Sequence, residues 1–302
     1  MHIIRVNERT HLFDDLSIAL GYFDGIHQAH QRVIQQAVTY ATTHQLKSAV
    51  LTFATNPNVF LKKRTQETLL TPLPEKIRLL TELGVDYLII VPFNQTVARL
   101  APADFIQKIL VPLRVRHVVT GFDFRFGYKG QGDVRVLAAY PTQFSLDVVM
   151  KRELEGEKIG TTEIRTYLAK GDVNMVTKML GRTYRMSGRV VIGRQKGREI
   201  GFPTANLELD DRYEVPARGV YAVNVLIADR VYRGMCNVGH NPTFNYNENI
   251  SIEVHLLDFS GDLYGKRLSL EFIAFIREEQ RFSSVDALIS QLQADEKTIR
   301  DL

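Results

Sequence analysis

The sequence predicts an α/β domain with a doubly wound parallel sheet, followed by an antiparallel β-barrel domain with a C-terminal helix. The chain has 302 residues, more than a single hydrophobic core usually organises. Its first half alternates short β-branched runs with amphipathic helical patterns, as strand–helix–strand crossovers do. From residue 187 to residue 276, short alternating strands are separated by glycine, asparagine and aspartate turns.

Five strands and two long helices are expected in the first domain. The strands are residues 17–20, 48–53, 87–91, 117–120 and 147–150. Apolar residues recur at helical spacing from Val33 to Ala41, and again in a segment that Pro74 opens and Gly84 closes. This alternation predicts helices packed on a parallel sheet.

Residues 160–180 predict two short helices that close the first domain. The first begins at Thr161 or Thr162 and the second at Asp172. We therefore expect two domains, residues 1–180 and 181–302. The tail predicts a further helix, capped by Ser283 or Ser284, that packs on the barrel. Its expected apolar face consists of Val285, Leu288, Ile289 and Leu292.

Composition excludes several classes of protein. Hydrophobic residues make up 45% of the chain and charged residues 24%, which is typical of a globular protein. The net charge is +4 and basic residues are scattered, so no nucleic-acid partner is expected. No apolar run reaches the roughly 20 residues of a membrane span, and no signal segment is apparent, which predicts a cytoplasmic protein without a membrane partner. Cys236 is the single cysteine and excludes an internal disulfide. A homo-oligomer is left open.

The strongest signal in the first domain is residues 20–30, LGYFDGIHQAH, between the first strand and the first helix. Glycines allow a ligand to approach the backbone, and a helix N-terminus favours anions. His27 and His30 share one helical face, which can hold a triphosphate. On the histidines alone, an exposed polar turn or a partial metal site is the alternative.

This segment resembles the signature of the nucleotidylyltransferase superfamily, in the version carried by bacterial FAD synthetases. Residues 120–127 (TGFDFRFG) and 161–165 (TTEIR) match the same family in the same order. The resemblance implies that the phosphate of FMN attacks the α-phosphorus of ATP, forming FAD and pyrophosphate. It implies flavin binding by Asp123 and Phe124, and catalysis by His27, His30 and Arg165, with Arg165 meeting the pyrophosphate. The implied nucleotide-binding residues are Gly21, Phe23, Asp24, Gly25, His27, His30, Thr161, Thr162 and Arg165.

The second domain carries a longer motif, residues 188–207, GRVVIGRQKGREIGFPTANL. Its glycines and basic residues indicate a loop around phosphates, although the Gly-Lys-Ser or Gly-Lys-Thr of a Walker motif is missing. Thr204 and Asn206 offer neutral oxygens, which suit Mg²⁺ already bound to nucleotide phosphates. The glycine-rich part alone could equally be a hairpin with solvated charges.

The motif resembles riboflavin kinase along its whole length. Residues 216–222, 237–239 with 242–244, 253–259 and 263–265 match that family in order. The resemblance implies that Glu253 is the general base that takes the proton of the riboflavin 5′-hydroxyl. It implies flavin binding by Asn206 and Arg277, and Mg²⁺ binding by Thr204 and Asn206. The implied nucleotide-binding residues are Gly193, Lys196, Gly197, Arg198, Gly201 and Thr204. His255 shares a strand face with Glu253 and receives no role.

Nearly the whole chain thus resembles the bacterial bifunctional riboflavin kinase and FMN adenylyltransferase family. The resemblance implies two ATP-dependent reactions, riboflavin to FMN and FMN to FAD. Three departures from the family pattern bear on the second reaction: Ala29 replaces a glycine, Thr55-Asn56-Pro57 replaces a Pro-His-Pro triplet, and Gly160 replaces a serine. One alternative is therefore a riboflavin kinase whose N-terminal domain binds flavin or nucleotide with little turnover. A flavin-responsive regulatory or interaction protein is a second alternative.

Overall fold

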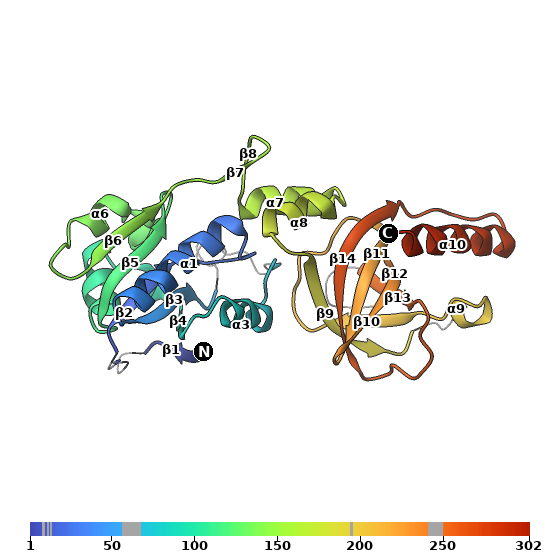
Figure 1. Ribbon diagram of the computed structural model, residues 1–302, viewed down its shortest axis with the longest axis horizontal. Helices are drawn as coiled ribbons and strands as arrows, with labels where there is room; N and C mark the ends of the chain where they lie inside the picture. The colour runs from blue at the N-terminus through green and yellow to red at the C-terminus, as the bar shows by residue number, and fades with distance from the viewer. Residues whose placement is uncertain (8–9, 11, 13, 56–67, 194–195, 241–249) are drawn as a thin grey trace. The chain divides into compact units, whose positions relative to one another are not determined.

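The computed structural model describes residues 1–302 except 8–9, 11, 13, 56–67, 194–195 and 241–249. The chain forms two compact units, Met1–Gly160 and Thr161–Leu302. The first is built on a parallel sheet and the second on a closed antiparallel barrel (Figure 1). The predicted α/β domain followed by a barrel is confirmed.

The sheet of the first unit has six strands in the order β1-β4-β3-β2-β5-β6, and every neighbouring pair is parallel. The strands are β1 (His2–Arg5), β2 (Leu16–Leu20), β3 (Lys47–Phe53), β4 (Tyr87–Val91), β5 (Val115–Gly121) and β6 (Ser145–Val149). Strands β2 to β6 are the five predicted from sequence. Strand β1 was not predicted, because it is a four-residue edge strand that is mostly exposed and lacks a continuous apolar run.

Both faces of the sheet are covered, because successive residues of a strand point to opposite faces. Ala19 packs with residues of α1 (Gln28–Thr43) and α3 (Leu73–Glu82), whereas Ile18 packs with Phe105 and its neighbours on the other face. The remaining elements of this unit are α4 (Gln95–Ala98), α5 (Pro102–Phe105), the π-helix η1 (Ile106–Leu110), the 3₁₀ turn η2 (Tyr128–Gly130), α6 (Val134–Ala138), and the short pair β7 (Glu153–Leu154) and β8 (Glu157–Lys158).

The second unit begins with two helices and continues into a barrel of order β10-β13-β12-β11-β14-β9. Asp172 caps the second helix by accepting a hydrogen bond from the Met175 backbone at 3.0 Å, and Gly181 ends it with a φ of 69°. Its elements are α7 (Thr161–Ala169), α8 (Val173–Leu180), β9 (Tyr184–Val191), α9 (Lys196–Glu199), β10 (Ala205–Leu209), β11 (Gly219–Ile227), β12 (Arg230–His240), β13 (Ile250–Leu256), β14 (Arg267–Arg277) and α10 (Val285–Arg300).

The boundary between the two units follows Gly160, twenty residues before the boundary after residue 180 that the sequence predicts. Helix α8 contacts β9 and β14, and Gly171, between the two helices, lies beside Phe275 and Tyr221. Helices α7 and α8 therefore belong to the barrel unit by packing, because their apolar residues are buried there. The assignment of residues 161–180 to the first functional domain stays a prediction.

The C-terminal helix α10 contacts β12 and β14, as expected (Figure 1). Ser284 caps it through a 3.1 Å hydrogen bond from the Ala287 backbone. Ile299 is buried in a core cluster, against which Ile289 and Leu292 also pack. The prediction that Val285 belongs to the apolar face is wrong, because this residue, in the first turn of α10, is 58% exposed. Within the described residues, no helix is both long and apolar enough to cross a membrane.

Candidate active sites

In the first unit, the predicted ligand loops follow two neighbouring strands. Strand β2 lies between β3 and β5, so the order of the sheet reverses there. Leu20 pairs with Thr120 at the carboxyl ends of β2 and β5, and the Thr120 hydroxyl donates to the Leu20 carbonyl at 3.4 Å. Ligands of open α/β sheets bind in the crevice at this kind of switch point. Residues 21–27 and 122–127 both start from it.

The loop after β2 is strained and is held by burial of its own side chains. Phe23 and Ile26 have φ values of 54° and 40°, and Gly25 has a φ of 90°. Each non-glycine residue in such a conformation costs about 1–3 kcal/mol. Phe23 is 2% and Ile26 1% exposed, and burying such a side chain contributes about 1.5–3 kcal/mol, which offsets the strain. A Cβ on Gly21 would lie 2.8 Å from the Phe23 ring, so this position requires glycine.

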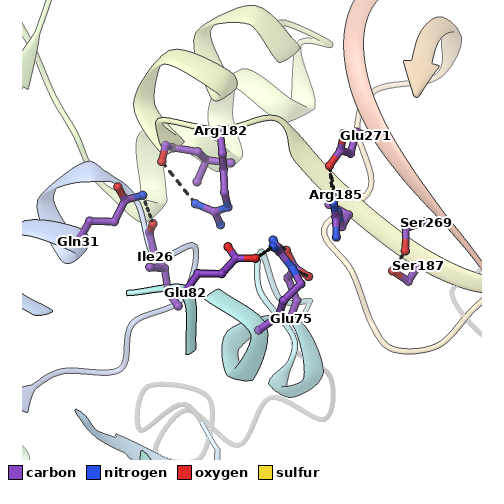
Figure 2. A network of polar contacts seen from close by, with 11 residues as sticks. Ile26, Gln31, Glu75, Glu82, Arg182, Arg185, Ser187, Ser269 and Glu271 are labelled. Carbon is purple, nitrogen blue, oxygen red and sulfur yellow. Dashed lines mark hydrogen bonds and ion pairs between the residues drawn. The ribbon is translucent and has the colours of Figure 1, made fainter. Parts of the chain in front are cut away.

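His27 caps helix α1 and lies against His30. The His30 backbone N–H donates to His27 Nδ1 at 3.3 Å, which places the proton of a neutral His27 ring on Nε2. The two imidazole rings stack with centroids 3.6 Å apart, and Phe23 packs edge-on to His30. Gln31 donates to the Ile26 carbonyl at 2.9 Å (Figure 2). Two donors are thus fixed at the positive end of a 16-residue helix, where phosphate is favoured.

Two further contacts hold this loop. The buried Asp24 carboxylate accepts a hydrogen bond from the Thr71 backbone at 3.0 Å. The Tyr22 carbonyl accepts from the Lys76 ammonium and the Thr52 hydroxyl, both at 2.8 Å. Asp24 therefore has a structural role in the loop. Sequence reasoning missed Lys76, because a single lysine in a helical pattern gives no signal that its ammonium is buried.

The predicted flavin residues lie just after β5. The Asp123 carboxylate pairs with the Lys158 ammonium at 2.9 Å, and that ammonium lies 5.6 Å from the centroid of the exposed Phe122 ring. Phe124 is half-buried and stacks on the buried Phe126 with centroids 5.8 Å apart. Phe122 belongs to the matched 120–127 segment, but Lys158 was not predicted from sequence, since it lies more than thirty positions away.

Thr161, Thr162 and Arg165 lie together on helix α7 of the second unit. Arg165 forms an ion pair with Glu214, in the segment between β10 and β11. That these three residues complete one site with His27 and His30 stays a prediction. Of the departures, Ala29 lies in the first turn of α1 and Gly160 directly precedes α7, while Asn56 and Pro57 lie outside the described residues.

In the second unit, glycines of the 188–207 motif are required for steric reasons. A Cβ on Gly193 would lie 2.2 Å from the Asn206 amide nitrogen. A Cβ on Gly197 would lie 2.2 Å from the Phe202 carbonyl oxygen, and Gly201 has a φ of +83°. The loop therefore closes tightly on β10. Lys196 begins α9 and Arg198 lies within it, whereas the motif residues 194–195 lie outside the described residues.

The proposed base sits in a row of polar residues across three strands. Glu253 on β13 pairs with Asn206 on β10 and with Asn237 on β12. Directly opposite residues of antiparallel strands share a face, with Cβ atoms roughly 5 Å apart. All three side chains are half-buried. Burial raises the pKa of the neighbouring Cys236 thiol, and the Glu253 charge raises it further, so this thiol is not a nucleophile.

A cavity of about 540 Å³ lies at the start of β10, whose first residue, Ala205, lines it. Arg198 and Thr204 line it, and their binding of nucleotide stays a prediction. Its other lining residues are Val190, Pro203, Ala205, Leu256, Phe259, Ser260, Gly261, Asp262, Leu263 and Tyr264. Its lining combines apolar side chains with hydroxyl, guanidinium and carboxylate groups, which suits a nucleoside with its phosphates. Of the lining residues 259–264, only Phe259, Leu263 and Tyr264 lie in segments that match the family in sequence.

His255 has a contact that explains its place on the strand face of Glu253. Its Nδ1 is 2.8 Å from the Pro203 carbonyl oxygen, and its ring packs edge-on to Phe202. The imidazole therefore holds the turn that leads into Thr204 and Asn206. Sequence reasoning left His255 without a role because nothing in the strand pattern shows this contact across 52 residues.

Arg277 is engaged by the C-terminal helix. Its guanidinium Nε lies 3.0 and 2.9 Å from the two carboxylate oxygens of the buried Asp295, and it also stacks over the Phe282 ring. This pairing fastens α10 to β14. Contact between Arg277 and flavin stays a prediction. Residues 242–244, part of a matched segment, lie outside the described residues.

The residues fit a magnesium ion that is held mainly by phosphates. Among the described residues, no group of three or more His, Cys, Asp or Glu side chains could hold a metal alone. Thr204 lines the cavity and Asn206 fills the space above Gly193, so two residues with neutral oxygen donors stand two positions apart in the chain. Magnesium accepts such a site when the nucleotide supplies further oxygens.

Comparison with known proteins agrees with this arrangement. The family model for FAD synthetase matches residues 10–163, and the model for riboflavin kinase matches residues 180–302. A Listeria monocytogenes protein named bifunctional riboflavin kinase/FMN adenylyltransferase is 39% identical over 301 residues, covering 99% of this chain and 95% of that protein. A Bacillus subtilis protein of the same name is 38% identical, covering 98% and 96%. A crystal structure from Streptococcus pneumoniae, titled as a macrolide-efflux protein, is 33% identical with a TM-score of 0.92 and covers 100% of both chains.

Proposed function

Because the chain belongs to the family of bifunctional riboflavin kinase/FMN adenylyltransferases, we propose that its barrel phosphorylates riboflavin to FMN and its first domain adenylylates FMN to FAD. The observation that carries the kinase assignment is the pairing of Glu253 with Asn206, which follows by two residues Thr204 in the lining of the 540 Å³ cavity. This pairing places Glu253, the implied base, next to Asn206, the implied ligand of the metal and the flavin.

In the kinase reaction, Glu253 accepts the proton of the riboflavin 5′-hydroxyl as that oxygen attacks the γ-phosphorus of ATP. The carboxylate needs positioning more than an unusual pKa, because the proton is lost as the new bond forms. Asn206 and Asn237 on the flanking strands restrict the position of Glu253. ATP occupies the cavity lined by Arg198 and Thr204, whose guanidinium and hydroxyl groups bind its phosphates.

Thr204 and Asn206 would hold Mg²⁺ together with the ATP phosphates. When bound, the ion neutralises charge on the phosphate oxygens. The glycines at 193 and 197 allow the loop backbone to approach the nucleotide without side-chain clashes. The isoalloxazine ring of riboflavin then needs an apolar surface near Glu253, for which the segment around Phe282 and Arg277 is the candidate.

In the adenylylation reaction, the FMN phosphate attacks the α-phosphorus of ATP and pyrophosphate leaves. His27 and His30, fixed at the start of α1, donate hydrogen bonds to the phosphates. Thr161, Thr162 and Arg165 bind the leaving pyrophosphate. Asp123 and Phe124 bind the flavin near the end of β5. No covalent enzyme intermediate is required, because alignment and charge stabilisation suffice for such a displacement.

The kinase-only alternative is not favoured, since the FAD synthetase model matches residues 10–163 and the relatives carry both activities in their names. The substitutions at Ala29, Asn56 and Gly160 make a direct test worthwhile. Purified protein is given FMN, ATP and Mg²⁺, and pyrophosphate release is measured. We expect stoichiometric FAD and pyrophosphate, both lost in His27→Ala. No release from the wild type at saturating substrates would leave only the kinase.

We place the enzyme in the cytoplasm, where its substrates ATP and riboflavin-derived FMN are available. The buried thiol of Cys236 is compatible with a reducing compartment. No nucleic-acid partner is proposed, because the basic residues are scattered among acidic ones. Fractionation of cells followed by assay of riboflavin phosphorylation tests the location, and activity confined to the membrane fraction would contradict it.

A further inference from the structure

Arg165 is held by the barrel through a specific carboxylate. It lies one turn after Thr161 on α7, and its guanidinium pairs with the Glu214 carboxylate. The two side chains are only 28% and 24% exposed, so solvent weakens the pair less than it would at the open surface. Glu214 lies between β10 and β11, 49 positions away along the chain and inside the kinase-like half.

The segment that carries Glu214 is itself fixed. The hydroxyl of the buried Tyr184 donates to the Glu214 carbonyl at 2.7 Å, and the Tyr221 hydroxyl donates to the Ala217 carbonyl at 2.5 Å. The Ala217 backbone N–H in turn donates to the Leu168 carbonyl at the end of α7, at 2.8 Å. Helix α7 and the Glu214 segment are therefore joined at two points, one through backbone and one through the ion pair.

This geometry suits the orientation of an arginine that must also bind phosphate. A guanidinium has five N–H donors in a planar fork, and the ion pair is made through one of its terminal nitrogens. Arginine loses side-chain entropy when it is ordered. A carboxylate that orders it before the substrate binds reduces the part of this cost that falls on binding.

We propose that Glu214 is a positioning residue for adenylyl transfer, which holds Arg165 in the orientation that meets the leaving pyrophosphate. This inference rests on the proposed role of Arg165 in that reaction. If so, the kinase-like half contributes to FMN adenylylation, because it carries the carboxylate of Glu214 that orders Arg165 of the adenylylation motif.

The test compares Glu214→Ala, Glu214→Gln and Arg165→Ala in the full-length protein, with FMN adenylylation and riboflavin phosphorylation measured on the same preparations. We expect Glu214→Ala to lower the kcat of adenylylation on the order of tenfold to a hundredfold, because Arg165 loses its orientation. Inhibition by added pyrophosphate should weaken by a similar factor. Glu214→Gln keeps an acceptor oxygen and should retain more activity than Glu214→Ala. In the double variant, Glu214→Ala should add little to Arg165→Ala.

A matched control comes from the same barrel. Arg185 on β9 pairs with Glu271 on β14 at 2.5 Å, with side chains 18% and 20% exposed (Figure 2). Glu271→Ala should leave the kcat of adenylylation and its inhibition by pyrophosphate unchanged, even if it lowers the melting temperature. A loss of adenylylation in Glu271→Ala equal to that in Glu214→Ala would show a general loss of barrel stability and overturn the inference.

The outcomes separate this inference from the proposed function. Unchanged or increased adenylylation in Glu214→Ala, with Arg165→Ala inactive, would overturn the positioning role alone. Full adenylylation in Arg165→Ala, or none in the wild type, would overturn the proposed role of the motif and this inference with it. Thermal unfolding of each variant distinguishes a lost orientation from a lost fold.

Discussion

Asn206 on β10 lies directly opposite Glu253 on β13, and its amide fills the space above Gly193. Asn206, the proposed metal and flavin ligand, therefore lies between the proposed base and the glycine loop of the kinase half. We expect a change at Asn206 to affect both of its neighbours. The predictions for the kinase reaction follow from this arrangement.

Glu253→Gln should abolish riboflavin phosphorylation while leaving the adenylylation of supplied FMN unchanged. The amide keeps the shape of the side chain and removes the proton acceptor, so kcat should fall by about 10²–10⁴-fold with little effect on the KM for ATP. Initial rates of both reactions on one preparation check this. Equal loss of both activities would contradict independent sites.

Gly193→Ala should disturb Asn206, because the added methyl would lie 2.2 Å from its amide nitrogen. We expect a fall in the kcat of riboflavin phosphorylation and a lower melting temperature. In Gly193→Ala combined with Asn206→Ala the clash is gone, so the melting temperature should recover although activity does not. A melting temperature in the double variant as low as in Gly193→Ala would show that the clash lies elsewhere.

His255→Ala should lower the kcat of riboflavin phosphorylation on the order of tenfold, because the turn at Pro203 loses the bond that places Thr204. His255→Asn offers an amide N–H near the position of Nδ1 and should restore part of the rate. The comparison is made on kcat with riboflavin and MgATP saturating. Equal rates in the wild type and His255→Ala would exclude this positioning role.

The stability of the first unit should fall as the pH drops below 6.5. Burial lowers the pKa of His117 from its ordinary value of 6.5, the His44 charge lowers it further, and Asp147 opposes both. The unfolded chain therefore binds a proton at a pH where folded His117 is still neutral, and the free energy of unfolding decreases as pH falls through this window. The buried His117 ring stacks on Tyr40 with centroids 3.4 Å apart and lies 2.7 Å from the Ser145 hydroxyl.

His117→Phe can retain the stacking on Tyr40 and cannot titrate. The melting temperature between pH 7.5 and 5.5 should therefore change less with pH in this variant than in the wild type. An equal slope in the two proteins would show that other groups cause the acid sensitivity.

Much of the fold could be predicted from sequence because period and turn signals are local. Strands β2 to β6, the Asp172 cap and the Gly181 stop appear in the structure at or close to their predicted places. The edge strand β1 and the packing of α7 and α8 on the barrel could not be predicted. Both depend on which surfaces meet after folding, and neither β1 nor the apolar faces of α7 and α8 specify a partner.

In the candidate sites, too, local motifs could be predicted from sequence and contacts between distant segments could not. Motif residues such as His27, Thr204 and Glu253 could be named because their types and order match known families. Contacts between distant segments could not: Lys76 with Tyr22, His255 with Pro203, and Glu214 with Arg165 each join positions about fifty residues apart. A single sequence contains no signal for such pairs, because no local pattern links them.

The most direct test of two sequential activities in one chain is a time course of products from riboflavin, ATP and Mg²⁺, separated by chromatography. We predict that FMN appears first and is then converted to FAD, and that Glu253→Gln forms neither from riboflavin yet forms FAD from added FMN. Accumulation of FMN without any FAD, or no conversion of riboflavin at all, would contradict the assignment of both reactions to this chain.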